Sequence, residues 1–147
     1  MYVAGFTICD SATRSGANCG LSSVTIGEGS TTTAYIHLDT VPESGTVVQF
    51  SISSASSGVV SVNPASVTFS STYTVGTGVE VVLTAVNNDI DHATDQTADI
   101  TFSIDTTGTT ASGYAALGDA TLVATVNDND TGGWSINMKV SFDAICR

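Results

Sequence analysis

Apolar and polar residues alternate along much of this chain with a period of two. In the segment 120–126, alternate positions are apolar: Ala120, Leu122, Ala124 and Val126. That period predicts β-strands with one buried face. The same alternation predicts further strands at residues 2–8, 24–26, 33–38, 48–52 and 97–104, and one strand at residues 59–69 that is interrupted at Asn63-Pro64. A helical period of 3.6 does not emerge, which disfavours the α/β classes.

Two parts of the pattern predict how particular residues are buried. Nearly every residue from Val79 to Val86 is apolar or β-branched. Such a run is typical of a central strand that is covered on both faces. In the strand at 33–38, His37 alternates with the apolar positions. It is therefore expected on the outer face, at the surface.

Seven strands separated by short turn-rich segments lie between Leu21 and Asp130. They predict an all-β, immunoglobulin-like antiparallel β-sandwich of about 100 residues, with a closed barrel as the alternative. Residues 1–20 form an N-terminal strand and a cysteine loop outside this unit. Residues 131–147 add a C-terminal strand, in which Trp134 to Ala144 alternates without a fault.

The two terminal strands admit three arrangements. They pair with each other or add to the sandwich edges, or one of them completes a sheet in a neighbouring subunit, because an added strand supplies main-chain hydrogen bonds. In the third arrangement, Trp134 to Cys146 opens a following module.

Composition narrows the set of partners. Lys and Arg total three against fourteen acidic residues, giving a formal charge of −11. That charge disfavours nucleic acid and anionic membranes and favours cations, although acidity also simply maintains solubility. No apolar run approaches the roughly 20 residues that span a bilayer, so membrane insertion is not expected. Met1 to Gly5 does not resemble a signal peptide, so a removed signal, a fragment, or release with a virus particle are the alternatives.

The three cysteines are Cys9, Cys19 and Cys146. A Cys9–Cys19 bridge would close a short polar loop and would suit an extracellular or virion-surface setting. Cys146 pairs with Cys9 instead if the terminal segments lie side by side. Three free thiols are the remaining alternative.

Residues for catalysis are sparse. His37 occupies an outward strand position, and His92 lies in an acidic loop, where it is expected to be solvated, with metal ligation as the alternative. Asp89, Asp91 and Asp95 do not suggest a substrate cleft, and Trp134 is the sole tryptophan. Because no nucleophile, base and orienting group are seen to converge, the chain is not expected to be an enzyme.

Oxygen-bearing side chains gather where strands end. The strand at 120–126 stops at Asn127, and three further Asp or Asn residues follow it. A second polar segment, residues 87–95, follows the strand at 79–86. Carboxylate and amide oxygens are the ligands that Ca²⁺ prefers. They also cap and solvate strand ends, which is the alternative interpretation.

Four motifs occur in an order that resembles the Calx-β family and its bacterial surface-repeat relatives. The motifs lie at Val24–Gly29, Val62–Phe69, Val82–Thr97 and Ala124–Asp130, and the stretch from the first to the last spans about three-quarters of the chain. The resemblance implies a seven-stranded sandwich that binds calcium where one module meets the next. Each motif is weak alone, and their specificity comes from the ordered set.

The resemblance also implies a set of calcium ligands in this chain. The implied side-chain and backbone ligands are Glu28, Asn88, Asp89, Ile90 through its carbonyl, Asp95, Asp128 and Asp130. Asn87 and Asn88 stand where the calcium-binding members usually have acidic residues, and Ser53 to Gly58 replaces an acidic segment. Fewer negative ligands predict weaker binding, or none.

These observations predict a non-catalytic, extracellular or surface-displayed β-sandwich module that works in adhesion or as a structural spacer, with Ca²⁺ stiffening its acidic end. Its partners would be neighbouring modules or subunits of the same assembly, or a cell-surface ligand. The alternative function is a virion or filament subunit that assembles through its terminal strands. A carbohydrate-binding or hydrolytic domain ranks below both.

Overall fold

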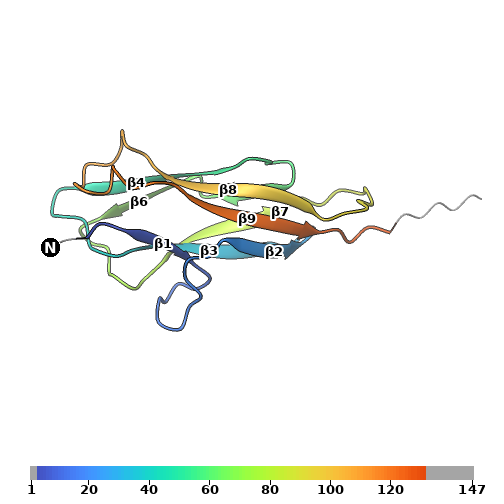
Figure 1. The fold of residues 1–147 in the computed structure, drawn as a ribbon, viewed down its shortest axis with the longest axis horizontal. Helices are drawn as coiled ribbons and strands as arrows, with labels where there is room; N and C mark the ends of the chain where they lie inside the picture. Colours follow the sequence, from blue (N-terminus) through green and yellow to red (C-terminus); the bar gives the residue numbers. More distant parts are fainter. Residues whose placement is uncertain (1–2, 132–147) are drawn as a thin grey trace, which may run out of the picture.

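A computed structural model describes residues 3–131, which form nine β-strands connected by turns and loops (Figure 1). Within this part of the chain, no helix is long and apolar enough to cross a membrane. In chain order, the strands are β1 (Phe6–Cys9), β2 (Ser23–Gly27), β3 (Thr31–Leu38), β4 (Val47–Ser54), β5 (Val60–Asn63), β6 (Ser66–Ser70), β7 (Val79–Ala85), β8 (Gln96–Ile104) and β9 (Ala120–Asn127).

The strands form two sheets that pack face to face. One sheet has the order β1-β3-β7-β5, and the other has the order β2-β9-β8-β4-β6. Neighbouring strands are antiparallel except β2 and β9, which run parallel from Ser23↔Val123 to Gly27↔Asn127. The chain is thus an all-β, immunoglobulin-like sandwich, which confirms the predicted fold class. The parallel pair makes one sheet mixed, a detail that the alternation did not reveal.

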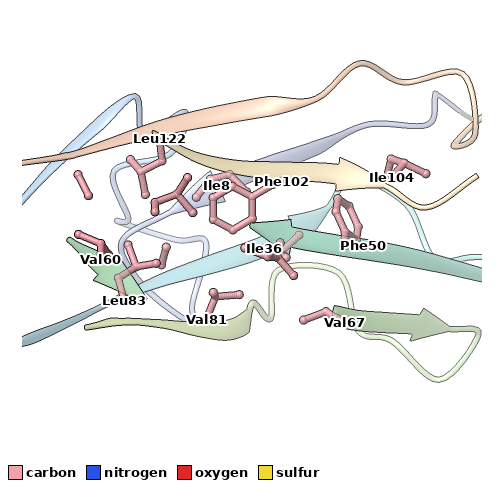
Figure 2. Close-up of a cluster of buried hydrophobic side chains, with 14 of the residues drawn as sticks. Ile8, Ile36, Phe50, Val60, Val67, Val81, Leu83, Phe102, Ile104 and Leu122 are labelled. Carbon is pink, nitrogen blue, oxygen red and sulfur yellow. The ribbon is translucent and has the colours of Figure 1, made fainter. Parts of the chain in front are cut away.

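The core lies between the sheets and is filled from both (Figure 2). Phe50 on β4 and Phe102 on β8 are fully buried, and so are Ile36 and Leu83 from the facing sheet. Phe50 makes an edge-to-face contact with Phe6, with ring centroids 4.9 Å apart. Such aromatic pairs stabilise a core by about 0.5–1.5 kcal/mol beyond their buried area. The period-two pattern therefore identified the inner faces correctly.

The prediction that residues 79–86 form a strand covered on both faces is wrong in its second part. β7 does lie inside its sheet, between β3 and β5. Its burial nevertheless alternates: Val81, Leu83 and Ala85 are buried, whereas Glu80 is exposed. The reason is that each sheet of a two-layer sandwich meets the other layer on one face only.

The expected surface position of His37 is also wrong, because its side chain is completely buried. Residues 10–18 and the turn ending at Gly78 enclose it from outside the sheet, and its Nε2 lies 2.8 Å from the Ser11 carbonyl oxygen. A loop that folds back over an outer face buries residues which the alternation assigns to solvent.

The N-terminal strand begins later than predicted, at Phe6, and adds to the edge of the four-stranded sheet through β3. Cys9 is bonded to Cys19, which confirms the first of the alternative pairings. Cys146 and the strand predicted from Trp134 to Ala144 lie outside the described residues.

Candidate metal site at the acidic end

The acidic end of the sandwich is built from three segments that are distant in sequence. They are the turn after β2, the loop between β7 and β8, and the residues that follow β9 (Figure 1). The parallel register of β2 with β9 places Gly27 beside Asn127. The Glu28 amide extends this pairing by donating to the Asn127 carbonyl, at 2.9 Å. Both strands therefore deliver their following carboxylates to one place.

The turn after β2 depends on Gly29. Its φ of +72° lies in the left-handed region, which side-chain-bearing residues rarely adopt. A Cβ built there would lie 3.0 Å from Oδ1 of Asn87. A glycine thus lets the turn approach the β7–β8 loop closely.

Three carboxylates meet at this end: Glu28, Asp128 and Asp130. One ligand oxygen from each lies within 4.8 Å of the other two. Glu28 is only 5% exposed, while both aspartates are half-buried. Carboxylates this close repel one another unless a proton or a cation lies between them.

Glu28 connects the segments through hydrogen bonds. Its Oε1 accepts from the Asn88 amide at 2.8 Å, and its Oε2 accepts from the Asn129 amide at 3.5 Å. The Asn129 side-chain amide donates in turn to the Glu28 carbonyl, at 3.1 Å. A buried carboxylate requires such partners, so Glu28 has a structural role whether or not a cation binds.

Asp128 and Asp130 lie side by side and experience opposite environments. The backbone amide of Asp130 donates to Asp128 at 3.1 Å, and the His92 amide donates to its other oxygen. These two hydrogen bonds, that from Asp130 first, lower the pKa of Asp128. Desolvation raises the pKa of Asp130, and the negative charge of Glu28 is the next largest cause.

One oxygen of Asp130 distinguishes this carboxylate from its neighbours. Asp130 Oδ2 is inaccessible to solvent and has no hydrogen-bond partner among the described residues. Asp128, Asp89 and Asp91 also raise its pKa through their charge. A divalent cation would supply the missing partner and would offset the repulsion within the cluster. The donor set, hard oxygens with a net negative charge, therefore fits Ca²⁺.

The other residues predicted as ligands surround the cluster rather than join it. Asn88 donates its amide to Glu28, but its side-chain oxygen accepts from the Ile90 amide, at 2.9 Å. Asp89 and Asp95 have exposed side chains, and neither belongs to the group of three carboxylates. Of the seven predicted ligands, the structure thus brings together Glu28, Asp128 and Asp130.

Two contributors to this site were missed at the level of sequence. In the sequence, Asn129 is only one member of an oxygen-rich run, yet it joins Glu28 through both its backbone and its side chain. The sequence draws attention to the ring of His92, whereas its backbone amide is what holds Asp128. Backbone donors leave no signature in residue identity, so only the fold identifies them.

Comparison with known proteins adds little to this geometry. No family model and no curated protein matches the sequence. Among solved structures, the chain is similar to SSP-19, an MSP-domain protein like family member from Caenorhabditis elegans. That match has 13% identity and a TM-score of 0.43, and covers 73% of this chain and 94% of SSP-19. The assignment of the sandwich therefore rests on strand pairing, and that of a function rests on the site.

Proposed function

We propose that the chain is a non-catalytic, extracellular β-sandwich module for adhesion or structural spacing, and that Ca²⁺ binds at its acidic end and stiffens it. The observation that carries this proposal is Oδ2 of Asp130, which lies beside Glu28 and Asp128 and is buried with no hydrogen-bond partner in the part of the chain that the structure describes. The Cys9–Cys19 disulfide is compatible with an oxidising compartment. Resemblance to Calx-β modules points in the same direction.

The position of the cluster supports a mechanical role for the cation. β9 ends at the acidic end, whereas β1 begins at the other end of the sandwich (Figure 1). A cation held by Glu28, Asp128 and Asp130 would join the turn after β2 to the segment that leaves β9. It would thereby restrict the direction in which the chain continues toward a neighbouring module or subunit. Glu28 and Asp128 would also keep their backbone hydrogen bonds.

Thermal unfolding with calcium and with chelator tests the metal claim. Extracellular modules bind calcium with Kd values of roughly 10⁻⁴ to 10⁻³ M. At about 10 mM Ca²⁺, linkage then predicts a stabilisation of about 1.4–2.7 kcal/mol over the chelated protein. Equal melting temperatures of the wild-type protein in the two buffers would eliminate the calcium site.

A matched pair of variants locates the effect. Asp130→Asn should abolish the calcium-dependent stabilisation, because it removes a ligand charge and the unpartnered oxygen. Asp99→Asn removes the same charge from an exposed position on β8, beside Val123 in the middle of the sheet. It should retain the full response. An equal loss in both variants would indicate that calcium acts only by screening the overall charge.

A second candidate function is a virion or filament subunit that assembles through its terminal strands. The supporting observation is that β1 lies at the edge of its sheet, as do β5, β2 and β6. Edge strands present unpaired backbone groups that an added strand can use. Size-exclusion chromatography of the full chain against one ending at Gly132 tests this: a monomer in both cases would rule it out.

A further inference from the structure

The disulfide loop, residues 10–18, lies over the outer face of the four-stranded sheet. The register pairs Thr7 with His37 and Cys9 with Tyr35, so these four side chains share one face. It is the face opposite to the core, because Ile8 and the other alternate residues point inward. Cys9 and His37 are nevertheless completely buried. The loop is what separates them from solvent.

Four contacts fasten this loop at its centre. The Gly78 amide donates to the Ala12 carbonyl at 2.6 Å, and the Arg14 amide donates to the Gly76 carbonyl at 3.0 Å. The Arg14 guanidinium pairs with Asp39 at 2.7 Å. The fourth contact joins the loop to the sheet through His37 Nε2 and the Ser11 carbonyl oxygen, 2.8 Å apart.

The contact with Ser11 defines which nitrogen of His37 carries the proton. A carbonyl oxygen can only accept, so Nε2 must donate. Nδ1 is then the bare nitrogen of the neutral ring, and it is buried without a hydrogen-bond partner among residues 3–131. Gly78 closes the space beside the same edge of the ring, because a Cβ there would lie 2.5 Å from Nε2 and 2.9 Å from Cε1. The imidazole is thus enclosed by the loop and by the turn that ends at Gly78.

No charged side chain among the described residues bonds to the second nitrogen. The charged side chains of the surrounding elements are Asp10 and Arg14 in the loop, Asp39 after β3, and Glu80 on β7. Asp10 accepts from Asn18, Asp39 pairs with Arg14, and Glu80 accepts from the Tyr35 hydroxyl. Neither β1 nor the turn at 74–78 carries a charged side chain. A proton on Nδ1 would therefore add a charge without solvent and an N–H without an acceptor.

We propose that His37 is an acid-operated latch for the disulfide loop. In neutral solution it holds the loop closed through Ser11. When the loop opens, water reaches both ring nitrogens and the ring can take up a proton. Acid therefore favours the open form, in which the loop stays tethered by Cys9–Cys19 and the outer face around Tyr35 is uncovered.

The size of the effect follows from proton linkage. If only the open form binds the proton, the opening equilibrium should increase about tenfold between pH 7.5 and pH 5.5. Amide hydrogen exchange by NMR, corrected for intrinsic rates, measures it at Gly78 and Arg14, whose amides bond across the interface. Their protection factors should decrease about tenfold. Amides in β8, such as that of Ile100, should show no such change.

The two histidines of the chain provide matched variants. His37→Gln keeps a donor for Ser11 but cannot take up the proton, so the pH dependence at Gly78 and Arg14 should disappear. His92→Gln changes the histidine of the acidic loop and should keep the pH dependence of protection at Gly78 and Arg14. Unchanged wild-type protection, or the same decrease in His37→Gln, would overturn the latch.

A measurement on the wild-type protein decides the matter if His37→Gln does not fold. The ¹⁵N shifts of the His37 ring report its protonation directly. The latch requires that protonated His37 appear only together with loss of protection at Gly78 and Arg14. A ring that titrates while both amides stay protected would contradict it.

Discussion

Removing the Cys9–Cys19 bridge should destabilise the protein by an amount set by the size of the loop. The two cysteines are 10 residues apart in sequence. In the chain-entropy treatment, a bridge that closes a loop of this size restricts the unfolded state by about 2.7 kcal/mol at 25 °C. The double substitution Cys9→Ala with Cys19→Ala should therefore reduce the free energy of unfolding by about 3 kcal/mol.

Two structural details bear on that value. Cys9 is completely buried on the outer face of its sheet, so an alanine there loses some packing and increases the cost slightly. Cys19 is exposed, so its truncation costs little by itself. For a chain of this length, a loss of 3 kcal/mol corresponds to a decrease in melting temperature of about 10 °C.

Urea unfolding of the double variant checks the loss, with Cys146→Ala introduced in both proteins so that no other thiol intervenes. Adding a reductant to the protein that retains the bridge should reproduce the effect without any substitution. A loss below about 1 kcal/mol in both experiments would refute the entropic reasoning. A loss in the variant alone would assign the effect to packing around Cys9.

Three further predictions concern single side chains. Gly29→Ala should reduce the free energy of unfolding by about 1–2 kcal/mol because of its left-handed backbone, and by more because residue 29 lies close to the β7–β8 loop. Gly45 has a φ of +80° and open space around it, so Gly45→Ala should show the backbone cost alone. Urea unfolding compares the two variants. The Tyr114 hydroxyl donates to the Thr40 carbonyl at 2.8 Å, so Tyr114→Phe should reduce the free energy of unfolding by about 1 kcal/mol in the same assay. In chelator, the contributions of Asp105 and Asp130 to the free energy of unfolding should change in opposite directions with pH. Backbone hydrogen bonds lower the pKa of Asp105, so its contribution is present above the ordinary pKa of about 3.9 and is lost as the pH falls through the lowered value. Asp105→Asn should destabilise at pH 7 but not in strong acid. Because the pKa of Asp130 is raised, its contribution is present below that ordinary value and is lost as the pH rises. Asp130→Asn should therefore gain stability over the wild type at pH 7, and the reverse result would show that its carboxylate is stabilised in the fold.

The alternation of apolar and polar residues predicts where most strands lie, because inner-face burial is a local property of each strand, but it does not separate β5 from β6, which belong to different sheets. It was not sufficient for the outer faces. His37 and Glu80 both occupy outer positions on neighbouring strands, yet one is buried and the other exposed. The difference depends on where residues 10–18 fold, which no period within β3 or β7 encodes.

The residues of the candidate site are likewise only partly predictable from the sequence. The oxygen-rich run after β9 predicted Asp128 and Asp130 directly, and family resemblance added Glu28. What the sequence could not provide is the parallel register of β2 with β9, a pairing between segments 100 residues apart. That register is what buries Glu28 and selects these three carboxylates from the larger predicted set.

Asp130 is the residue that separates a cation site from ordinary capping of strand ends. Capping accounts for Glu28 and Asp128, since both accept backbone hydrogen bonds from neighbouring segments. It does not account for Asp130, whose Oδ2 is buried without a partner and whose raised pKa records an unfavourable environment for its charge. Under capping alone, neutralising Asp130 should stabilise the protein equally with calcium and with chelator. Under cation binding, the same change should stabilise in chelator and destabilise in calcium, and this reversal of sign is what capping cannot produce.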